Sequence, residues 1–512
     1  MIYLSKSKYC QGKQCPKMLW MDRNKKDLFD RSVLSGARLE VGNEVGDLAM
    51  GYFGDFVEVK FGKHRSDMVT VTHKYLDDGE KVIAEASFVF DGNFCSVDIL
   101  RVNDDGSFDV VEVKSSTSKN ADEETSEEKK VKAVYLDDMA YQYYVLTNCG
   151  YKVNTISLMQ LNKEYIRHGE LDIHELFVVE DYTDIVKSMQ SEIPTTLASI
   201  TAVAEQKSEP LSDDYIGNRC NKPYECGYKA YCWHDMPENN VFDIGCGLWG
   251  SKKDKYYHDG LLTMEDALNA GVIKSERQIR QIETKLNGLP PHIDKEGIRE
   301  FLDTLWYPLY YFDFETWQQA IPLFDGVWPY EQIPTQYSLH IQNEPGGELI
   351  HKEFLGKEGE DPRRTIAERI CEDIPKDGCM IAYWATFEIT RLRELAEMFP
   401  DLSDHLLAIV ENTWDLIVPF NSGHYYCEAM GGRTSIKVVL PAFFPDDPEL
   451  DYHALDLVHD GMEAANAFAT LHEQTPEDIA RIRVALLKYC ELDTLAMVKI
   501  LEKLYAISKY WD

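Results

Sequence analysis

The chain has 512 residues, which is long for one hydrophobic core and predicts about three structural units. Hydrophobic residues make up 44%, no apolar run approaches the roughly 20 residues that span a bilayer, and the N-terminus lacks the apolar region of a signal peptide. We therefore expect a cytoplasmic protein without a membrane segment. The 53 basic and 88 acidic residues give a formal net charge of −35 at pH 7, which argues against a protein that coats nucleic acid over its whole surface.

The first 38 residues reverse this sign, because they hold nine Lys or Arg against three Asp. One interpretation is a solvated basic face. The other is a local phosphate-binding surface for nucleic acid, which an enzyme with a negative overall charge can use.

Strand-like runs follow a helical stretch at residues 33–52. The runs are 57–60, 68–73, 82–90, 95–102 and 108–113. The turn pairs Asp78-Gly79, Asp91-Gly92 and Asp105-Gly106 lie among them, as hairpins require.

Two of these runs carry charged side chains with a possible chemical role. Strand alternation places Glu112 and Lys114 on one face, and Asp98 lies on the preceding run. An Asp and a Glu can hold a divalent cation, while a lysine can position the attacking water and neutralise charge on a phosphate. The alternative is a solvated charge pair. Asp98 followed by Glu112-x-Lys114 resembles the PD-(D/E)xK nuclease motif on the restriction-endonuclease-like fold.

This resemblance implies two further site residues. RecB-like and CRISPR-associated iron–sulfur nucleases carry a Gln-x-x-x-Tyr motif on the helix that follows, where this chain has Gln142 and departs from the motif at Leu146. The same families often place a metal-binding histidine on the early helix, and Glu44 would take that place here. An exposed helix charge is the alternative interpretation of Glu44.

Three of the twelve cysteines are clustered, at Cys220, Cys226 and Cys232. Three thiolates with one distant cysteine can supply the four sulfur ligands of an iron–sulfur cluster or of a zinc ion. Cys15 is the favoured fourth ligand and Cys10 competes with it. One early cysteine and three after the nuclease core resemble the CRISPR-associated and AddB-type nucleases, which implies a structural [4Fe-4S] cluster; Zn²⁺ is the alternative.

The C-terminal part, residues 304–512, opens with an aromatic strand over 310–316 in which Asp313 and Glu315 alternate onto one face. Two adjacent carboxylates suit Mg²⁺ or Mn²⁺. Glu388 follows a predicted strand at 379–383, and Asp493 lies on a helix, four residues after Tyr489 and on the same face. Asp493 could bind metal while Tyr489 orients a water.

This constellation resembles the tyrosine subtype of the DEDD 3′-to-5′ exonucleases, which have an RNase H-like fold. The resemblance implies a metal site made of Asp313, Glu315, Glu388 and Asp493. The second motif departs from the family pattern, because Trp384 stands where Asn is usual and Glu388 where Asp is usual. We expect Asp415 to act as a cap or ion-pair partner, with a supporting catalytic acid as the alternative.

The predicted architecture is α/β, with a restriction-endonuclease-like domain over 1–235, a helical linker over 236–303 and an RNase H-like domain over 304–512. This order resembles a bacterial family in which a RecB-family nuclease is joined to a domain of unknown function. The predicted function is a metal-dependent nuclease with two sites that acts on nucleic acid. The expected substrate is DNA with a single-stranded 3′ end, and RNA is the alternative. The alternatives are a nucleic-acid-binding scaffold in which one nuclease domain is inactive, the C-terminal one being favoured, and a zinc-stapled interaction protein.

Overall fold

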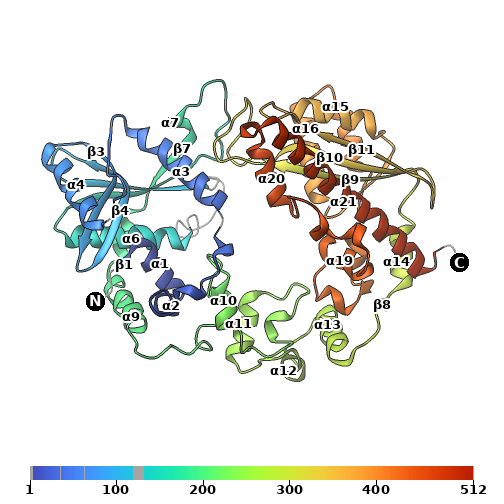
Figure 1. The fold of residues 1–512 in the computed structure, drawn as a ribbon, viewed down its shortest axis with the longest axis horizontal. Coiled ribbons are helices and arrows are strands. Elements are labelled where there is room, and N and C mark those ends of the chain that lie inside the picture. The colour runs from blue at the N-terminus through green and yellow to red at the C-terminus, as the bar shows by residue number, and fades with distance from the viewer. Residues whose placement is uncertain (1–3, 35, 63, 119–131, 511–512) are drawn as a thin grey trace. The chain divides into compact units, whose positions relative to one another are not determined.

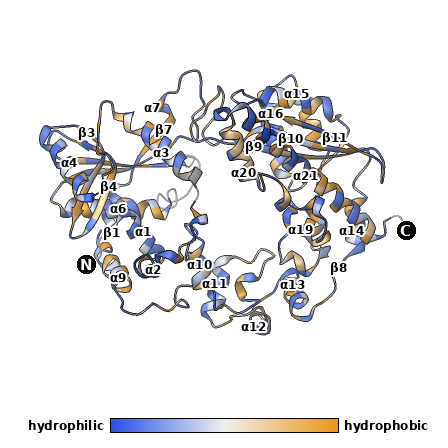
Figure 2. Ribbon diagram, in the orientation of Figure 1, coloured by the Kyte–Doolittle hydropathy of each residue, from blue (hydrophilic) through white to orange (hydrophobic). Residues whose placement is uncertain are grey.

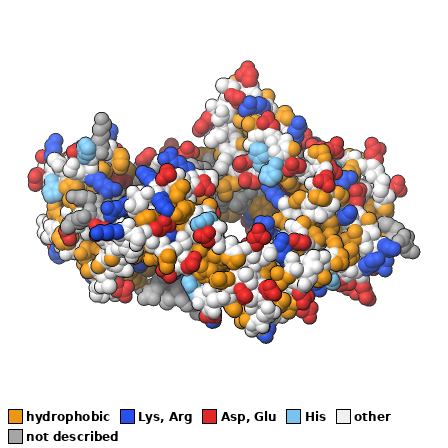
Figure 3. Space-filling view, turned by 60° about the horizontal axis from the view of Figure 1, so that its bottom comes forward, with side chains coloured by type: hydrophobic (Ala, Val, Ile, Leu, Met, Phe, Trp, Pro, Cys, Tyr) orange, Lys and Arg blue, Asp and Glu red, His pale blue; other side chains and the backbone are white. Residues whose placement is uncertain are grey.

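The computed structural model describes residues 4–34, 36–62, 64–118 and 132–510 (Figure 1). The chain forms two compact units, and each combines a mixed β-sheet with helices, as the α/β class predicts. The first unit comprises residues 1–236 and 319–330, and the second comprises 237–318 and 331–512. In Figure 3 acidic side chains are spread over the visible face with basic ones among them, in keeping with the negative net charge.

The first unit is built on a sheet whose strand order is β2-β3-β4-β5-β6-β7, with β1 also paired to β4. Strands β3, β4 and β5 are antiparallel neighbours, whereas β6 lies parallel to β5. Asp91 and Gly92 join β3 to β4 with positive φ values of 45° and 79°, which confirms the predicted hairpin turn. The strands are β1 (Leu4–Ser5), β2 (Val57–Glu58), β3 (Val82–Phe90), β4 (Asn93–Val102), β5 (Phe108–Thr117), β6 (Val153–Leu161) and β7 (Phe177–Asp181).

Helices pack on this sheet through apolar side chains. Figure 2 shows hydrophobic residues on both the strands and the helices. The strand predicted at 68–73 is wrong, because Met68 and Thr72 are buried one helical turn apart on α4. The long helix after β5, α6, connects it to the parallel strand β6. The helices of this unit are α1 (Lys6–Gln14), α2 (Pro16–Asn24), α3 (Gly36–Met50), α4 (Arg65–Asp78), α6 (Ala133–Asn148), α7 (Ile173–Leu176), α8 (Thr183–Ser188), α9 (Ile193–Ala204) and α10 (Lys229–Cys232).

The second unit is built on a sheet with the order β11-β10-β9-β12-β13. Strands β9, β10 and β11 are antiparallel, whereas β12 is parallel to β9 and β13 is parallel to β12. A separate short pair joins β8 to β14. The strands are β8 (His292–Ile293), β9 (Leu309–Trp317), β10 (Ile333–Gln342), β11 (Leu349–Leu355), β12 (Cys379–Ala382), β13 (Thr413–Asp415) and β14 (Tyr425–Tyr426).

Helices cover both faces of this second sheet. One face packs Phe312, Phe314, Tyr337 and Leu339 against α15, α16 and α17. The opposite face is crossed by α21, which contacts β9 and β10. The helices are α11 (Gly250–His258), α12 (Met264–Asn269), α13 (Glu276–Asn287), α14 (Lys295–Leu302), α15 (Arg363–Asp373), α16 (Thr386–Met398), α17 (Ser403–Glu411), α18 (Val418–Asn421), α19 (Ile436–Phe443), α20 (Gly461–Ala469) and α21 (Pro476–Ser508).

Helix α21 begins as its sequence predicts. Thr475 is the N-cap and accepts a hydrogen bond from the Asp478 amide at 3.2 Å, with Pro476 in the first turn. Among the described residues, no helix combines the length and the apolarity needed to cross a membrane.

The two units differ from the predicted division of the chain at two places. Residues 237–303, predicted as most of a separate linker, belong to the second unit, where α14 packs on α21 and β8 pairs with β14. Residues 319–330 lie within the predicted C-terminal domain but belong to the first unit. There Arg167 donates to the Pro322 carbonyl at 2.7 Å and Tyr330 donates to the Ser115 carbonyl at 2.7 Å.

Candidate metal centres

Three carboxylates of the second unit converge as the sequence predicts. Asp313 and Glu315 point from β9 toward α21, because Phe312 and Phe314 occupy the core on the opposite face. Asp493 faces them from α21, and one oxygen from each of the three residues lies within 4.8 Å of the others.

Glu388 lies beside this group, at the start of α16. Its side chain is buried, and its Oε2 atom has no hydrogen-bond partner among the described residues. The Glu388 charge raises the pKa of both Asp313 and Glu315, so all four predicted acids share one electrostatic site. An unpartnered buried carboxylate oxygen is costly unless a cation satisfies it.

Burial and mutual repulsion make this acidic site hard to ionise. Burial raises the pKa of Glu315 and of Glu388 to about 8, and the Asp493 charge adds to both shifts. The pKa of Asp493 rises to about 6 through burial, and that of Asp313 lies well above its usual range. A bound divalent cation would reverse these shifts, since hard oxygen ligands are the donors that Mg²⁺ and Mn²⁺ prefer. The donor set therefore fits such an ion.

Two side chains that sequence reasoning missed complete this site. The Lys437 ammonium donates to the Tyr489 hydroxyl at 2.9 Å and lies over the Tyr489 ring. Tyr452 donates to Asp493 Oδ1 at 2.5 Å. Lys437 is the one charged residue in the otherwise apolar stretch of α19, which was the available signal.

Asp415 binds the backbone just before α16, and its charge adds to the effect of burial in raising the pKa of Glu388, so both of its predicted roles remain open. Its carboxylate accepts hydrogen bonds from the Trp384 amide at 2.9 Å and the Ala385 amide at 3.1 Å, at the start of α16. These bonds hold Trp384 at a φ of 68°, a conformation that costs energy for a bulky residue. The Trp384 side chain is 60% exposed. A strained backbone thus presents a large aromatic surface to solvent four residues before Glu388.

The acids of the first unit lie against ammonium groups. Glu112 is fully buried, and Asp98 Oδ2 accepts a hydrogen bond from the Val113 amide at 2.7 Å. Lys114 pairs with Glu112, as neighbours on one strand face should. The Lys6 ammonium lies 2.9 Å from Glu112 Oε2 and 3.6 Å from Asp98 Oδ1, between the two acids predicted to hold a metal.

Helix α6 adds Gln142 and Asp138 to this cluster. Gln142 Nε2 donates to Glu112 Oε2 at 2.6 Å, while its Oε1 atom is buried without a partner among the described residues. Asp138, which the sequence analysis missed, accepts from Lys114 at 2.9 Å. Burial and the Glu112 charge raise the pKa of Asp138 to about 7. Its position one helical turn before Gln142 was the signal for it.

Glu85 also faces this cluster, and Glu44 does not join it. Glu85 is skipped in the pairing of β3 with β4 and has a φ of 57°, and burial followed by the Asp98 charge raises its pKa to about 7. The Glu44 side chain is exposed on α3, with Val45 and Ala49 facing the core instead. Within the described part of the chain, no hydrogen bond or ion pair links Glu44 to the acids, so its alternative interpretation as a surface charge fits better.

The four predicted cysteine ligands, Cys15, Cys220, Cys226 and Cys232, line one cavity between α2 and α10. Burial raises the pKa of Cys15 to about 11 and that of Cys226 to about 12, with further increases from the neighbouring thiols. No three of the four sulfurs lie within 4.8 Å of one another. Cys10 does not line the cavity; its pKa is raised by burial and by Asp138, which places it near the acids of the first unit.

The basic N-terminal segment is largely engaged in ion pairs. Five of its lysines pair with acids within the first unit, which leaves less free positive charge for phosphate than the sequence suggests. The lysines are Lys6, Lys8, Lys13, Lys17 and Lys25.

Comparisons with known proteins reach only part of the chain. A family model described as "Domain of unknown function (DUF2779)" matches residues 310–435, a stretch that contains Asp313, Glu315 and Glu388 but ends before α21. An "Uncharacterized protein MG366 homolog" of Mycoplasma pneumoniae is 27% identical over 231 residues, 40% of this chain and 34% of the relative. "Uncharacterized protein MG366" of Mycoplasma genitalium is 26% identical over 208 residues, 37% of this chain and 31% of the relative. The matches thus span about a third of each relative's length, and no solved structure matches the chain.

Proposed function

We propose that the chain is a metal-dependent nuclease whose main site is a 3′-to-5′ exonuclease centre in the second unit. The observation that carries this proposal is the convergence of Asp313, Glu315 and Asp493 within 4.8 Å, beside a Glu388 oxygen that has no partner among the described residues. Close-set acids of which Glu388 and Asp493 are buried cost stability unless a counter-charge compensates them, and they are suited to a divalent cation.

The strand arrangement supports an RNase H-like domain in this unit. Its sheet runs β11-β10-β9-β12-β13, with three antiparallel strands followed by two parallel ones. The acids lie on the central strand β9 and on helices next to it, where the DEDD pattern would require them.

In this proposal Asp313, Glu315, Glu388 and Asp493 hold Mg²⁺ or Mn²⁺, which would supply Lewis-acid activation of water and stabilise charge on the phosphate. The residues of the chain itself have separate tasks. Tyr452 holds Asp493 in position by its hydrogen bond, and Lys437 directs the Tyr489 hydroxyl, which orients the attacking water. The exposed Trp384 ring offers a stacking surface for a base at a single-stranded 3′ end of DNA.

A second site of the PD-(D/E)xK type in the first unit remains part of the proposal. The order β3-β4-β5, helix α6 and parallel β6 suits a restriction-endonuclease-like core, and Glu112, Lys114 and Gln142 are in contact. Lys6 lies against Asp98 and Glu112, so a metal ion there would have to displace this ammonium. This geometry favours the second unit as the active one, in contrast to the alternative in which the C-terminal domain is inactive.

We also propose that Cys15, Cys220, Cys226 and Cys232 hold a [4Fe-4S] cluster that joins the two ends of the first unit. A single tetrahedral Zn²⁺ with bonds of about 2.3 Å would bring the sulfurs to roughly 3.8 Å from one another. The proposal of the larger cluster rests on the resemblance to the iron–sulfur nucleases and on the single cavity that all four cysteines line. A cytoplasmic location is consistent with this role, because reduced thiols are available there as ligands.

The decisive test is cleavage of end-labelled DNA and RNA, single- and double-stranded, in the presence of Mn²⁺. We expect a ladder that shortens from the 3′ end with the wild type and vanishes with Asp313→Ala, while Lys114→Ala, which alters the other unit, leaves it in place. A ladder that persists in Asp313→Ala would refute the exonuclease centre, and loss only in Lys114→Ala would transfer the activity to the first unit. If the wild type cleaves none of these substrates, the binding scaffold becomes the better interpretation.

A further inference from the structure

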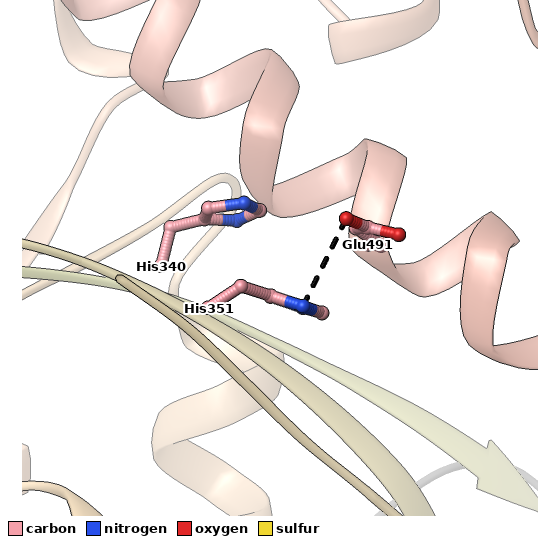
Figure 4. A group of neighbouring side chains, drawn as sticks. All are labelled: His340, His351 and Glu491. Atoms are coloured by element: carbon pink, nitrogen blue, oxygen red, sulfur yellow. Dashed lines mark ion pairs between the residues drawn. The ribbon is translucent and has the colours of Figure 1, made fainter. Parts of the chain in front are cut away.

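A second group of metal-binding side chains lies on the same helix as Asp493 but outside the carboxylate site. His340 on β10, His351 on β11 and Glu491 on α21 each offer a ligand atom, and these atoms lie within 4.8 Å of one another (Figure 4). The two imidazole rings are stacked with their centroids 4.6 Å apart, and Glu491 faces the His351 ring from the helix.

Two hydroxyl groups fix both imidazoles. Thr494 Oγ1 lies 2.8 Å from His340 Nδ1, and Ser338 Oγ lies 2.9 Å from His351 Nε2. The two hydroxyls are 2.7 Å apart, and the Thr494 hydroxyl donates onward to the Glu491 carbonyl at 3.1 Å.

One assignment of protons makes all of these hydrogen bonds. The Thr494 proton goes to the Glu491 carbonyl, the Ser338 proton goes to Thr494, and each histidine donates from the nitrogen next to its hydroxyl. The lone pairs then lie on His340 Nε2 and His351 Nδ1. Orientation of metal-binding histidines by a hydrogen bond from the other ring nitrogen is the usual arrangement in metal sites.

The third side chain has no competing role. The Glu491 carboxylate makes no hydrogen bond within the described residues, and its distance of 3.8 Å from His351 Nδ1 is too long for one. His340 is buried, whereas the side chains of His351 and Glu491 are 24% and 46% exposed. One side of the group is thus open to solvent, which gives an ion a path of entry.

We propose that His340, His351 and Glu491 bind a divalent transition metal of the zinc type, at a site distinct from the carboxylate centre. Two imidazole nitrogens and one carboxylate oxygen suit Zn²⁺, with a fourth position left for water or another ligand. Mg²⁺ is a poor occupant because it prefers oxygen ligands alone.

Such an ion would fasten α21 to the edge of the sheet. Glu491 is two residues before Asp493, and Thr494 is one residue after it. A metal bridge from β10 and β11 to Glu491 therefore fixes the rotation and height of the helix segment that carries Asp493. The proposed metal would thus position α21, and the proposal does not depend on whether the protein is a nuclease.

The test is metal content and spectroscopy of the full-length protein. Wild type, His351→Ala, Glu491→Gln and the control His472→Ala, an exposed histidine elsewhere in the unit, are equilibrated with Zn²⁺ and freed of excess ion. All keep their cysteines, so any zinc at the thiols is common to all. We expect wild type and His472→Ala to retain one more equivalent of Zn²⁺ than the two site variants.

Cobalt provides a second measurement that does not depend on counting. Co²⁺ at the histidine site should give visible absorption of a four-coordinate ion without the near-ultraviolet thiolate band, and this absorption should be lost in His351→Ala but kept in Asp313→Ala. Glu491→Gln preserves side-chain size, so circular dichroism is expected to show it folded. Equal zinc content and equal cobalt spectra in wild type, His351→Ala and folded Glu491→Gln would overturn the proposal.

Discussion

The Lys6 ammonium lies 2.9 Å from the buried Glu112 carboxylate, and 106 residues of sequence separate the two. It also lies 3.6 Å from Asp98 and 3.7 Å from Asp138, so Lys6 contacts three acids of the first unit, two of which Lys114 also pairs with. In the second unit, the Lys437 ammonium donates to the Tyr489 hydroxyl, and no ion pair joins it to Asp313 or Asp493 within the described residues. The two clusters therefore make different demands on a metal ion.

Removal of the Lys6 charge should destabilise the protein and make its stability depend on a bound metal ion. We expect Lys6→Met to lower the free energy of unfolding in a chelator by about 3 kcal/mol, because the acids of this cluster would then share the Lys114 ammonium alone. Added Mn²⁺ should restore part of this loss. Chemical denaturation should be done in an Asp313→Ala background, so that metal binding at the carboxylate site of the second unit does not contribute. Equal free energies of unfolding with and without Lys6→Met would contradict the prediction.

The acids of the second unit predict a pH-dependent stability in the absence of metal. Burial raises the pKa of Glu315 to about 8, so the folded protein holds this proton more tightly than the unfolded chain. Its contribution to stability is present in full below the usual pKa of glutamate and is lost as the pH rises through about 8. Thermal unfolding in a chelator should thus show a falling melting temperature over this range.

The control for this pH profile is Glu315→Gln, which keeps the shape and removes the titration. The difference between the two profiles isolates the site from Asp138 and Glu85 of the first unit, whose pKa values are also raised to about 7. We further expect Mn²⁺ affinity of the wild type to increase with pH over the same interval. Melting temperatures that change with pH in the same way for wild type and Glu315→Gln would rule out a titration of Glu315 as the cause.

Tyr489 and Lys437 should act as a pair in exonuclease turnover. We expect Tyr489→Phe to reduce kcat by about 100-fold, the lower end of what a positioned proton-transfer group contributes. Lys437→Met should cause a loss of the same order, because its ammonium holds the Tyr489 hydroxyl at 2.9 Å. The double variant should lose little more than either single one.

The matched control is Lys499→Met, which alters a partly exposed lysine of α21 that pairs with Glu502. Single-turnover kinetics on a labelled single strand would separate these effects from binding. Independent, fully additive losses in the double variant would argue that Lys437 contacts the substrate directly instead.

The choice of Cys15 over Cys10 is open to a direct comparison. Cys15 lines the cavity with the three later cysteines, whereas Cys10 lies near the acids. We expect Cys15→Ser to lose iron and brown colour, and Cys10→Ser to retain both. Iron and sulfide analysis after anaerobic purification is the measurement, and a colourless wild type containing zinc would favour the single-ion alternative.

The sequence predicted those parts of the site that depend on residues close together along the chain. The alternation around Asp313 and the Thr475 cap follow from periods and spacings that are visible in the sequence. Lys6 could not be assigned, because its contact with Glu112 depends on how the whole first unit folds. The same holds for Lys437, which reaches Tyr489 over 52 residues. Helix α4 was mistaken for a strand since Val69 and Val71 alternate there, while Met68 and Thr72 set the period that the structure uses.

The path of the chain between β9 and β10 has a practical consequence for experiments on separate halves. The strand that carries Asp313 and Glu315 continues directly into residues 319–330, whose Ala320, Ile321 and Tyr330 pack in the apolar core of the first unit. A fragment that stops at residue 236 would lack this piece and expose the surface it covers. A fragment that starts after residue 236 would contain residues 319–330 but lack the part of the first unit on which they pack. Work on either half alone should therefore begin by supplying or replacing this twelve-residue segment.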